Sequence, residues 1–371
     1  METKKYRFDE VTINFDKKRI PLSSAQREKR QGTFRYYGAQ GVIDHVDDYI
    51  FDGTYLLIAE DGENLKSKKQ NIAQVVDGQF WVNNHAHIVQ GNEQCDTRFL
   101  CYLINSMDLS GYVTGSAQPK LSQANLNAVT LSLPTLAEQK RIVEYLYMLD
   151  QKIDVNRQIN DNLQQQAAAL FSSLYDRSNT EVRFTDLIQI LGGGTPKTGE
   201  NTYWNGNIAF FTPKDVGIPY TLITEKTISK EGLSHCNSRL YPVNTVFVTA
   251  RGTVGKVGMS GVPMAMNQSC YALVGKETHQ LLVYFYTLKA VDRLKHKASG
   301  AVFDAITTRD FESEQIMKLS DDDATAFLRV AEPMFQEVLN NNIENLRLST
   351  LRDSLLPKLM SGEIDVSAVQ L

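Results

Sequence analysis

The glycine-rich segment at residues 192–199 (GGGTPKTG) is the first place where the residue pattern could support catalysis or nucleotide binding. A phosphate-binding loop requires Gly-Lys-Ser/Thr at the start of a helix, whereas Lys197 follows Pro196 and precedes the final glycine. No Asn/Asp-Pro-Pro-Tyr/Phe quartet is present, so the sequence carries no adenine methyltransferase site. No GxGxxG motif follows a predicted strand.

The histidines and cysteines also lack the spacing of a reactive or metal site. His85 and His87 alternate along a predicted strand, where we expect a solvated or core pair. There is no HExxH motif, and the four cysteines form neither a CxxC pair nor a His-flanked zinc spacing. We therefore predict no catalytic residue, no bound metal and reduced thiols.

Residues suited to recognition interleave in turn-rich segments of both halves of the chain. Lys and Arg, with loop hydroxyls and backbone N–H groups, can bind phosphates, while Arg, Asn and Gln can contact base edges through two hydrogen bonds. This combination predicts a nucleic-acid interface. The candidate contact residues are Arg35, Tyr36, Lys68, Lys69, Gln118, Lys120, Thr195, Lys197, Tyr203, Lys214, Arg251, Thr253, Lys256, Asn267 and Gln268.

The net charge of −4 does not exclude such an interface, because the charges are unevenly distributed. Residues 17–35 contain seven Lys or Arg residues and a single acid, Glu28. We expect local basic patches on an acidic chain.

An internal duplication with an offset of 185 residues positions these segments. The offset relates Leu121 to Ile306 and holds without a gap as far as Leu174 and Leu359. Upstream of these residues the match weakens and needs small gaps. The pattern indicates a shared scaffold that carries two diverged globular parts.

Two long helices form the conserved part of the repeat. Apolar residues and asparagines recur at alternating spacings of four and three, which is typical of a coiled coil. Thr135 and Glu138 form a capping box that predicts the start of the first helix. Pro333 predicts a start or a kink early in the second helix, and Gly362 predicts its end.

Each heptad seam has two asparagines at its midpoint. An antiparallel pairing places Asn156 against Asn345 and Asn160 against Asn341, and every other seam position then meets a seam position. A parallel pairing would also bring asparagine to asparagine, so the pattern sets the register and not the direction. We take the direction from geometry and expect antiparallel helices, with the two globular domains at opposite ends of the pair. Buried asparagine layers fix register at a cost in stability.

These patterns predict an α/β (α+β) chain with two pseudo-repeated mixed α/β domains joined by two long helices in an antiparallel coiled coil. The predicted parts are a first domain at 1–133, a helix at 134–177, a second domain at 178–319, a helix at 320–362 and a tail at 363–371. The alternative, two ordinary amphipathic core helices, does not account for the exact repetition of ten seam positions.

Along nearly its whole length the chain resembles the specificity subunit of type I restriction–modification systems. The motifs are PTLAEQKRIV at 134–143, LRDSLLPKLMSGE at 351–363, GTPK at 194–197, YWNG at 203–206, RGTVGK at 251–256 and NQ at 267–268. The first domain lacks the GGGTP, YWNG and RGTxG motifs, and the second helix begins with ATAFLR instead of an ExQxxI opening.

The resemblance implies a non-catalytic cytoplasmic protein in which each domain recognises one half of a split double-stranded DNA target. The coiled coil would set the spacer and dock the partners: DNA methyltransferase subunits, expected to number two, and restriction/translocase subunits. S-adenosylmethionine, ATP and magnesium would belong to those partners, and this chain would hold no cofactor. No apolar run approaches the about 18 residues of a membrane span, so no membrane partner is expected.

Two other functions remain as alternatives. One is a non-enzymatic coiled-coil scaffold whose α/β ends bind other proteins. The other, a nuclease, would need a clustered D…(D/E)xK metal site, and the only similar segment, Glu138-Gln-Lys140, is explained by helix capping.

Overall fold

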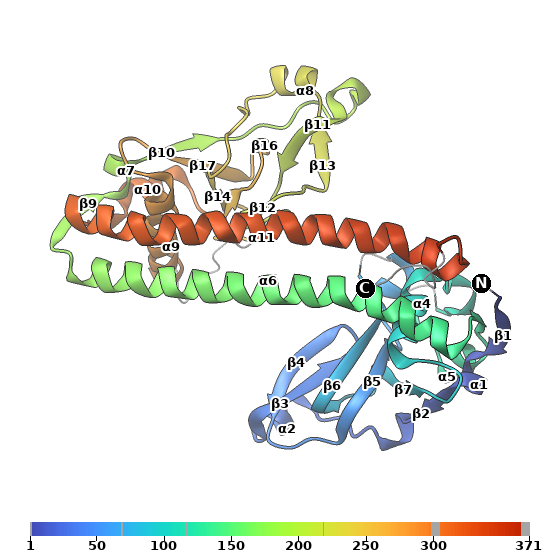
Figure 1. The fold of residues 1–371 in the computed structure, drawn as a ribbon. Coiled ribbons are helices and arrows are strands. Elements are labelled where there is room, and N and C mark those ends of the chain that lie inside the picture. The colour runs from blue at the N-terminus through green and yellow to red at the C-terminus, as the bar shows by residue number, and fades with distance from the viewer. Residues whose placement is uncertain (1, 68–69, 116–117, 218, 298–304, 365–371) are drawn as a thin grey trace. The chain divides into compact units, whose positions relative to one another are not determined.

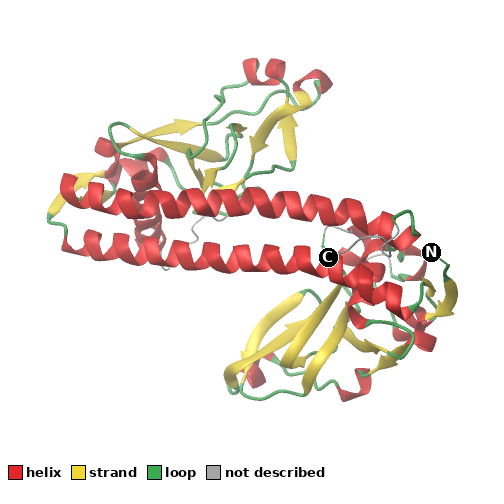
Figure 2. Ribbon diagram, viewed as in Figure 1, coloured by secondary structure: helices red, strands yellow, loops and turns green. Residues whose placement is uncertain are grey.

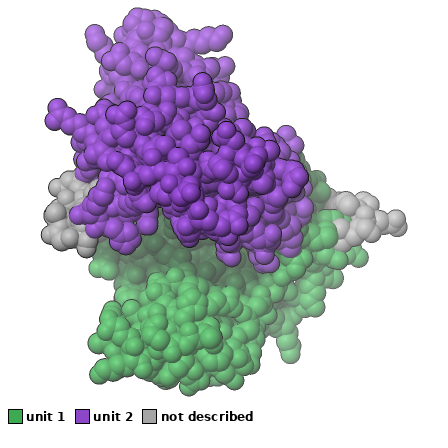
Figure 3. Space-filling view, turned by 90° about the vertical axis from the view of Figure 1, so that its left-hand side faces the viewer, with its two compact units in different colours: residues 1–151, 348–371 green, residues 152–347 purple. Residues whose placement is uncertain are grey.

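The computed structural model describes residues 2–67, 70–115, 118–217, 219–297 and 305–364. The chain divides into two compact units (Figure 3). Unit 1 comprises residues 1–151 and 348–371, and unit 2 comprises residues 152–347. Each unit therefore contains one globular domain together with a segment of each long helix.

Unit 1 contains a six-stranded mixed sheet in the order β2-β7-β5-β6-β3-β4. All neighbours pair antiparallel except β3 and β6, which are parallel. A separate two-stranded antiparallel ribbon pairs β1 with β8, the first and last strands of the unit. The strands are β1 (Lys4–Arg7), β2 (Thr12–Asn14), β3 (Gln31–Gly38), β4 (Gly41–Val46), β5 (Phe51–Ala59), β6 (Ala73–Val82), β7 (Ala86–Gly91) and β8 (Thr130–Leu133).

Short helices and one longer helix complete unit 1. Helix α4 begins after Asp96, whose carboxylate accepts hydrogen bonds from two first-turn N–H groups, and it packs on β5, β6 and β7 through Phe99, Leu100 and Ile104. The elements are α1 (Phe8–Val11), η1 (Asp16–Lys18), α2 (Ser24–Glu28), α3 (Asn64–Ser67), α4 (Thr97–Ser106), η2 (Ser110–Tyr112) and α5 (Gln123–Asn127). A separate cluster around Phe51 and Phe80 contains the alternate residues of the same strands.

Unit 2 contains a five-stranded sheet, β10-β17-β14-β15-β12, a three-stranded sheet, β13-β11-β16, and a ribbon, β18-β9 (Figure 2). The strands are β9 (Thr180–Arg183), β10 (Ile188–Gly192), β11 (Trp204–Phe211), β12 (Tyr220–Thr221), β13 (Lys226–Ile228), β14 (Val246–Thr249), β15 (Val257–Ser260), β16 (Met264–Met266), β17 (Cys270–Gly275) and β18 (Gln315–Lys318). The helices are α7 (Phe184–Leu187), η3 (Asn201–Tyr203), α8 (Lys230–Ser234), α9 (Gln280–Lys297) and α10 (Thr308–Ser313).

The two units share a topology that their sequences only partly reveal. The order β2-β7-β5-β6 in unit 1 has a counterpart in β10-β17-β14-β15 of unit 2. An isolated bridge joins Asp61 to Lys120, and a matching bridge joins Arg251 to Ala305, which is 185 residues beyond Lys120. The loop after β5 therefore corresponds to the loop after β14, which supports the predicted duplication.

Two long helices, α6 (Leu136–Arg177) and α11 (Asp321–Ser361), carry the heptad seams. None of the twenty predicted seam residues is exposed. They are Ile142, Leu146, Leu149, Ile153, Asn156, Asn160, Leu163, Ala167, Leu170 and Leu174 of the first helix, and Phe327, Ala331, Met334, Val338, Asn341, Asn345, Leu348, Arg352, Leu355 and Leu359 of the second. The Thr135–Glu138 capping box precedes α6, as predicted, and Gly362, with φ of 76°, follows the last residue of α11. No helix among the described residues is long and apolar enough to cross a membrane.

A start or a kink was predicted at Pro333. The start is wrong, because the helix begins twelve residues earlier, and the kink stays a prediction. Helix α11 begins at Asp321 after Ser320, whose hydroxyl accepts a hydrogen bond from the Asp323 N–H, and it continues through Pro333. An interior proline costs about 3 kcal/mol or more because it removes a helix hydrogen bond. Around it Phe327, Ala331, Phe335 and Val338 are buried, and their packing offsets this cost.

Within each unit, the segments of α6 and α11 lie side by side and antiparallel (Figure 1). In unit 2 the ring of Phe171 lies 5.5 Å from that of Phe327, while the asparagines nearer the middle of the helices pair as described below. In unit 1 the guanidinium of Arg352 donates to Asp150 at 2.6 Å, and Asp150 accepts from the Tyr102 hydroxyl of α4 at 2.5 Å. This polar triad joins the first domain to both helices.

Candidate nucleic-acid interface

Four segments of unit 2 that carry candidate contact residues lie together at one edge of its sheets. The Asn267 N–H donates to the Phe211 carbonyl at 2.9 Å, and the Arg251 N–H donates to the Ser269 carbonyl at 3.3 Å. The Thr253 hydroxyl donates to the Pro213 carbonyl at 3.2 Å. We call this group, comprising residues 193–197, 212–215, 251–256 and 267–269, the unit 2 loop cluster. It brings together eight of the predicted residues, with Asn267 at its base: Thr195, Lys197, Lys214, Arg251, Thr253, Lys256, Asn267 and Gln268.

Close backbone packing explains the glycines at 193 and 194. A Cβ on Gly193 would lie 2.1 Å from the Asn267 carbonyl oxygen, and the Gly194 N–H donates to the Met266 carbonyl at 3.1 Å. This approach places the exposed Thr195 beside the exposed Gln268, and the threonine hydroxyl donates to the glutamine side-chain oxygen. The pair therefore presents its remaining donors and acceptors to solvent, as a base-contacting pair must.

The 251–256 turn is organised by Thr249, a fully buried residue at the end of β14 that the sequence analysis did not single out. Its hydroxyl donates to the Thr253 carbonyl and accepts from the Lys256 N–H at 2.9 Å. Its carbonyl accepts from the Gly255 N–H at 2.9 Å. The turn holds Arg251 and Lys256 exposed at its two ends. The run of β-branched and aromatic residues that predicts β14 was the only signal for Thr249.

Tyr203 and Trp204 lie next to the Lys197 end of the loop cluster. The Tyr203 ring stacks on His235 with centroids 4.8 Å apart, and the Trp204 indole N–H donates to the Lys197 carbonyl at 3.1 Å. The side chains of Tyr203 and Trp204 are half-buried, whereas Lys197 is exposed. Tyr203 therefore has a packing role as well as the predicted contact role. Lys214 is exposed and lies 3.8 Å from Glu225, a distance typical of a weak surface pair.

In unit 1 the candidate residues are less concentrated. Gln118 and Lys120 are exposed, and the Lys120 ammonium lies 3.3 Å from a Glu60 carboxylate oxygen. The Lys66 ammonium donates to the Gly115 carbonyl at 2.9 Å, which joins the loops after β5 and before α5. Lys68 and Lys69 lie outside the described residues.

The prediction that Tyr36 contacts DNA is wrong. Its side chain is fully buried, and its hydroxyl accepts from the Leu22 N–H at 2.9 Å. Tyr36 alternates with the exposed Arg35 along β3, so the two residues point to opposite faces of the strand. The Arg35 guanidinium donates to the Asp77 carbonyl at 2.7 Å, which uses part of its hydrogen-bonding capacity inside the domain.

Three arginines of the basic run at residues 17–35 are neutralised by acids of unit 1. Arg19 pairs with Glu60 at 2.9 Å, Arg27 with Asp44 at 2.8 Å, and Arg30 with Asp47 at 2.8 Å. These acids lie far enough away in sequence that the run appears unopposed when read alone. The three arginines are therefore mainly structural.

His87 belongs to a buried ion pair and not to a metal site. Its Nδ1 lies 2.6 Å from an Asp16 carboxylate oxygen, and its Nε2 lies 2.8 Å from the Leu121 carbonyl oxygen. Both partners accept hydrogen bonds, so both ring nitrogens must carry protons. Burial lowers the pKa of His87, but the hydrogen bonds to Asp16 and Leu121 outweigh it and raise that pKa overall. Burial raises the pKa of Asp16, and its bonds to His87 and the Ile88 N–H lower it overall.

No group of three or more His, Cys, Asp or Glu side chains able to hold a metal occurs among the residues described. The four cysteines are free, with Cys95 and Cys270 buried and the other two partly buried. Burial raises the pKa of Cys95, Cys101 and Cys270 to about 12, which makes these thiols poor nucleophiles and poor metal ligands at neutral pH.

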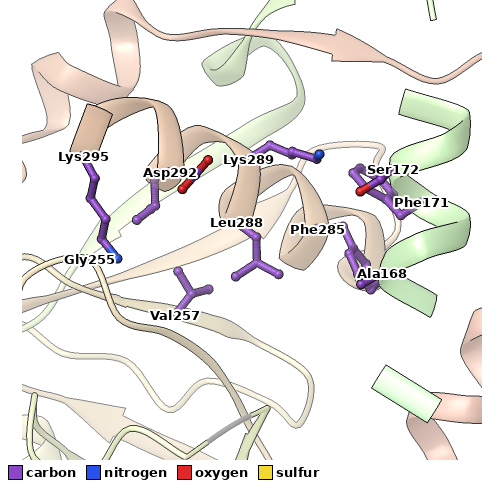
Figure 4. Close-up of a pocket in the computed structure, with 11 residues that line it drawn as sticks. Ala168, Phe171, Ser172, Gly255, Val257, Phe285, Leu288, Lys289, Asp292 and Lys295 are labelled. Carbon is purple, nitrogen blue, oxygen red and sulfur yellow. The ribbon is translucent and has the colours of Figure 1, made fainter. Parts of the chain in front are cut away.

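A cavity of about 370 Å³ lies between α6, α9 and the 251–256 turn of unit 2 (Figure 4). Its lining is mostly apolar, with Phe171, Val257 and Phe285 among the lining residues. Two lysines of α9, Lys289 and Lys295, also line it. Figure 4 shows the Lys295 side chain extending from α9 toward Gly255.

The seam asparagines pair as the antiparallel register requires. In unit 2 the Asn156 amide donates to the Asn345 side-chain oxygen at 2.9 Å, and the Asn341 amide donates to that of Asn160 at 2.9 Å. Asn160 also donates to Asn342 at 3.0 Å. Asn156, Asn160 and Asn341 are buried, so these bonds lie inside the helix pair.

Comparison with known proteins relates both globular parts to one family. The model described as "Type I restriction modification DNA specificity domain" matches residues 2–165 and again residues 177–318. The HindI specificity subunit of Haemophilus influenzae is 24% identical over a 402-residue alignment that covers 84% of each chain. A putative type I restriction enzyme specificity subunit of the same organism is 36% identical over 138 residues, 37% of this chain and 35% of that protein. The match thus spans about a third of the latter relative's length.

The fold has a counterpart among solved structures. A crystal structure of a type I restriction-modification system S subunit from M. genitalium aligns with a TM-score of 0.63 and covers 97% of this chain and 96% of that one. At 13% sequence identity this likeness concerns the fold alone. Because the family model matches both globular parts and most of the chain, the chain belongs to the family of type I restriction modification DNA specificity domain proteins.

Proposed function

We propose that this chain is the non-catalytic DNA-specificity subunit of a type I restriction–modification enzyme, in which each globular domain recognises one half of a bipartite DNA target. The observation that carries the proposal is the double match to the DNA specificity family, one match on each copy of the repeat. The unit 2 loop cluster supports it because exposed cations and amide side chains lie together on one edge of that domain.

The helix pair would set the length of the unrecognised spacer and dock the partner subunits. These partners would be two methyltransferase subunits and the restriction/translocase subunits, with S-adenosylmethionine, ATP and magnesium bound there. The asparagine layers would fix the register of the helices, because any slip would leave amide groups buried without partners. A cytoplasmic location would follow from this function.

Base recognition can be tested at Gln268. We expect Gln268→Ala in the full-length chain, co-expressed with its methyltransferase subunits, to weaken binding to the cognate duplex by about 1–3 kcal/mol. Binding to a scrambled duplex should stay the same. Gln315→Ala is the matched control, because Gln315 is an exposed glutamine of β18, outside both the loop cluster and the long helices.

The cognate target would be taken from the methylated motif of cells that carry the chain. Equal effects of Gln268→Ala on cognate and scrambled DNA would refute the readout role of that residue. A wild-type complex that binds the partner subunits but does not discriminate between duplexes would instead support the alternative, a protein-interaction scaffold.

A further inference from the structure

The 251–256 turn presents three consecutive backbone N–H groups that are available to a ligand. The N–H groups of Gly252, Thr253 and Val254 donate to no residue in the described part of the chain, whereas those of Arg251, Gly255 and Lys256 are all paired. Gly252 and Gly255 have φ values of 83° and 74°, a left-handed conformation that glycine adopts without strain. Successive N–H groups in a turn of this kind form a concave anion-binding surface.

A lysine from a different element lies directly on this turn. A Cβ on Gly255 would lie 2.6 Å from Cε and 3.4 Å from Nζ of Lys295, so the lysine stem covers the glycine and its ammonium lies beside the turn (Figure 4). Lys256 follows the glycine and Arg251 begins the turn, and both are exposed. Three cations from two elements therefore lie on or beside the turn that carries the unpaired N–H groups.

Among the described residues these three cations have no acidic partner, in contrast to several other cations of unit 2. The side chains of Arg251, Lys256 and Lys295 form no hydrogen bond or ion pair with any described residue. By contrast, Lys297 lies 2.6 Å from the buried carboxylate of Glu314. Other cations of the unit, such as Arg293 and Lys214, also have acidic partners.

Two carboxylates lie nearby. Asp292 lines the same cavity as Lys295, one helical turn earlier on α9, and lies 3.7 Å from His296 Nε2. The carboxylate of Asp215, in the neighbouring 212–215 loop, accepts hydrogen bonds from Thr212 and from the Glu225 N–H. Three cations against these two acids leave the turn with a positive local charge. This charge and the free N–H groups suit a singly charged phosphodiester.

We propose that the turn 251–256 and Lys295 together bind one phosphate of the DNA backbone, with Lys295 as a contact that does not depend on base sequence. The inference rests on the proposed function and deepens it. The Arg251 N–H is bonded to the Ser269 carbonyl, next to Gln268, so a phosphate held at the turn would fix the distance between the DNA backbone and the base-contacting pair. Phosphate contacts of this kind position a domain on DNA without specifying its sequence.

The test is the salt dependence of DNA binding by the full-length chain with its methyltransferase subunits. Lys295→Met keeps the aliphatic stem over Gly255 but removes the charge, and Lys295→Arg keeps the charge. Loss of one phosphate contact should reduce the slope of log K against log salt by about 0.9 for Lys295→Met, equally on cognate and scrambled duplexes. Lys295→Arg should retain the wild-type slope.

Lys276→Met is the matched control. Lys276 is an exposed lysine just beyond the other end of β17 from the loop cluster, and its variant should bind as wild type does. Lys256→Met supplies a second variant that cannot disturb the packing over Gly255, and it should lose a similar slope. An unchanged slope in both variants would overturn the inference, as would a slope lost equally by Lys276→Met.

The outcomes separate this inference from the proposed function. A loss confined to the cognate duplex would mean that Lys295 contacts a base, which overturns the phosphate assignment but leaves DNA recognition in place. Failure of the wild-type complex to bind DNA at any salt concentration would overturn the proposed function itself.

Discussion

The paired asparagines of the helix pair give the sharpest test of the packing. In unit 2 the Asn341 amide donates to Asn160, and both side chains are at most 5% exposed. Asn341→Ala removes the donor and leaves the Asn160 oxygen buried without it, which should cost about 1–3 kcal/mol of unfolding free energy. The double variant Asn160→Leu/Asn341→Leu removes both polar groups and buries two apolar side chains, so it should be neutral or stabilising.

Removing Asn160 also removes its hydrogen bond to Asn342, but solvent reduces the cost of that loss. Asn342, which accepts from Asn160, is only half-buried, so water can replace the bond that the double variant loses. The opposite signs of the single and double variants are therefore the expected signature. With the single variants Asn160→Leu and Asn341→Leu measured as well, the complete cycle should give a coupling free energy of about 1–3 kcal/mol, because the single-variant losses would not add.

Guanidinium unfolding followed by circular dichroism would measure these changes as shifts of the midpoint at constant m. Asn162→Ala, at an exposed position of α6 two residues from Asn160, is the matched control and should change stability by no more than about 0.5 kcal/mol. The reasoning would be refuted if Asn341→Ala behaved like this control. It would also be refuted if the double leucine variant were less stable than the single alanine variant.

Three further predictions concern the domains. The pKa of His87 is raised, so its contribution to stability is complete below pH 6.5 and is lost as the pH rises through the raised pKa. The pKa of Asp16 is lowered, so its contribution to stability is complete above pH 3.8 and is lost as the pH falls through the lowered pKa. Asp16→Asn should therefore destabilise the chain most between pH 3.8 and 6.5 and progressively less at higher pH, as measured by thermal unfolding across pH; a pH-independent difference would contradict the ion pair. Gly193→Ala should reduce discrimination between cognate and scrambled DNA, because its Cβ would lie 2.1 Å from the Asn267 carbonyl and displace the neighbouring loop; unchanged discrimination in a binding assay would contradict this positioning. Phe171→Ala should cost about 3–5 kcal/mol in chemical unfolding, because the ring is buried and stacks among several aromatic rings of unit 2, and a loss below about 1 kcal/mol would contradict that packing.

The helices were predictable because their determinants are local and periodic. The spacing of the seam residues, the Thr135 cap and Gly362 all appear in short stretches of sequence, and each has the predicted role in the structure. The register followed from a chemical match, since amides must meet amides in an apolar seam. Of the two outcomes predicted for Pro333, it does not start the helix, because its local penalty is outweighed by seam packing, which depends on residues of the partner helix.

The candidate site was predictable by segment but not by residue. Loops of unit 2 carry recognisable motifs and do come together. Thr249 shapes the 251–256 turn, but in the sequence it is indistinguishable from an ordinary strand residue. Tyr36 resembled a surface aromatic because strand alternation alone does not say which face is buried. The arginines at 19, 27 and 30 appeared free because their acidic partners lie 41, 17 and 17 residues away in the chain.

Methylome sequencing of cells with and without this chain tests the central claim most directly. If the chain specifies the target of a type I enzyme, cells that carry it should show adenine methylation at a split motif with two defined halves and a fixed spacer. That motif should disappear on deletion, and substitutions in the unit 2 loop cluster should alter only one of its halves. An unchanged methylome on deletion, or the loss of a continuous motif without a spacer, would contradict the account.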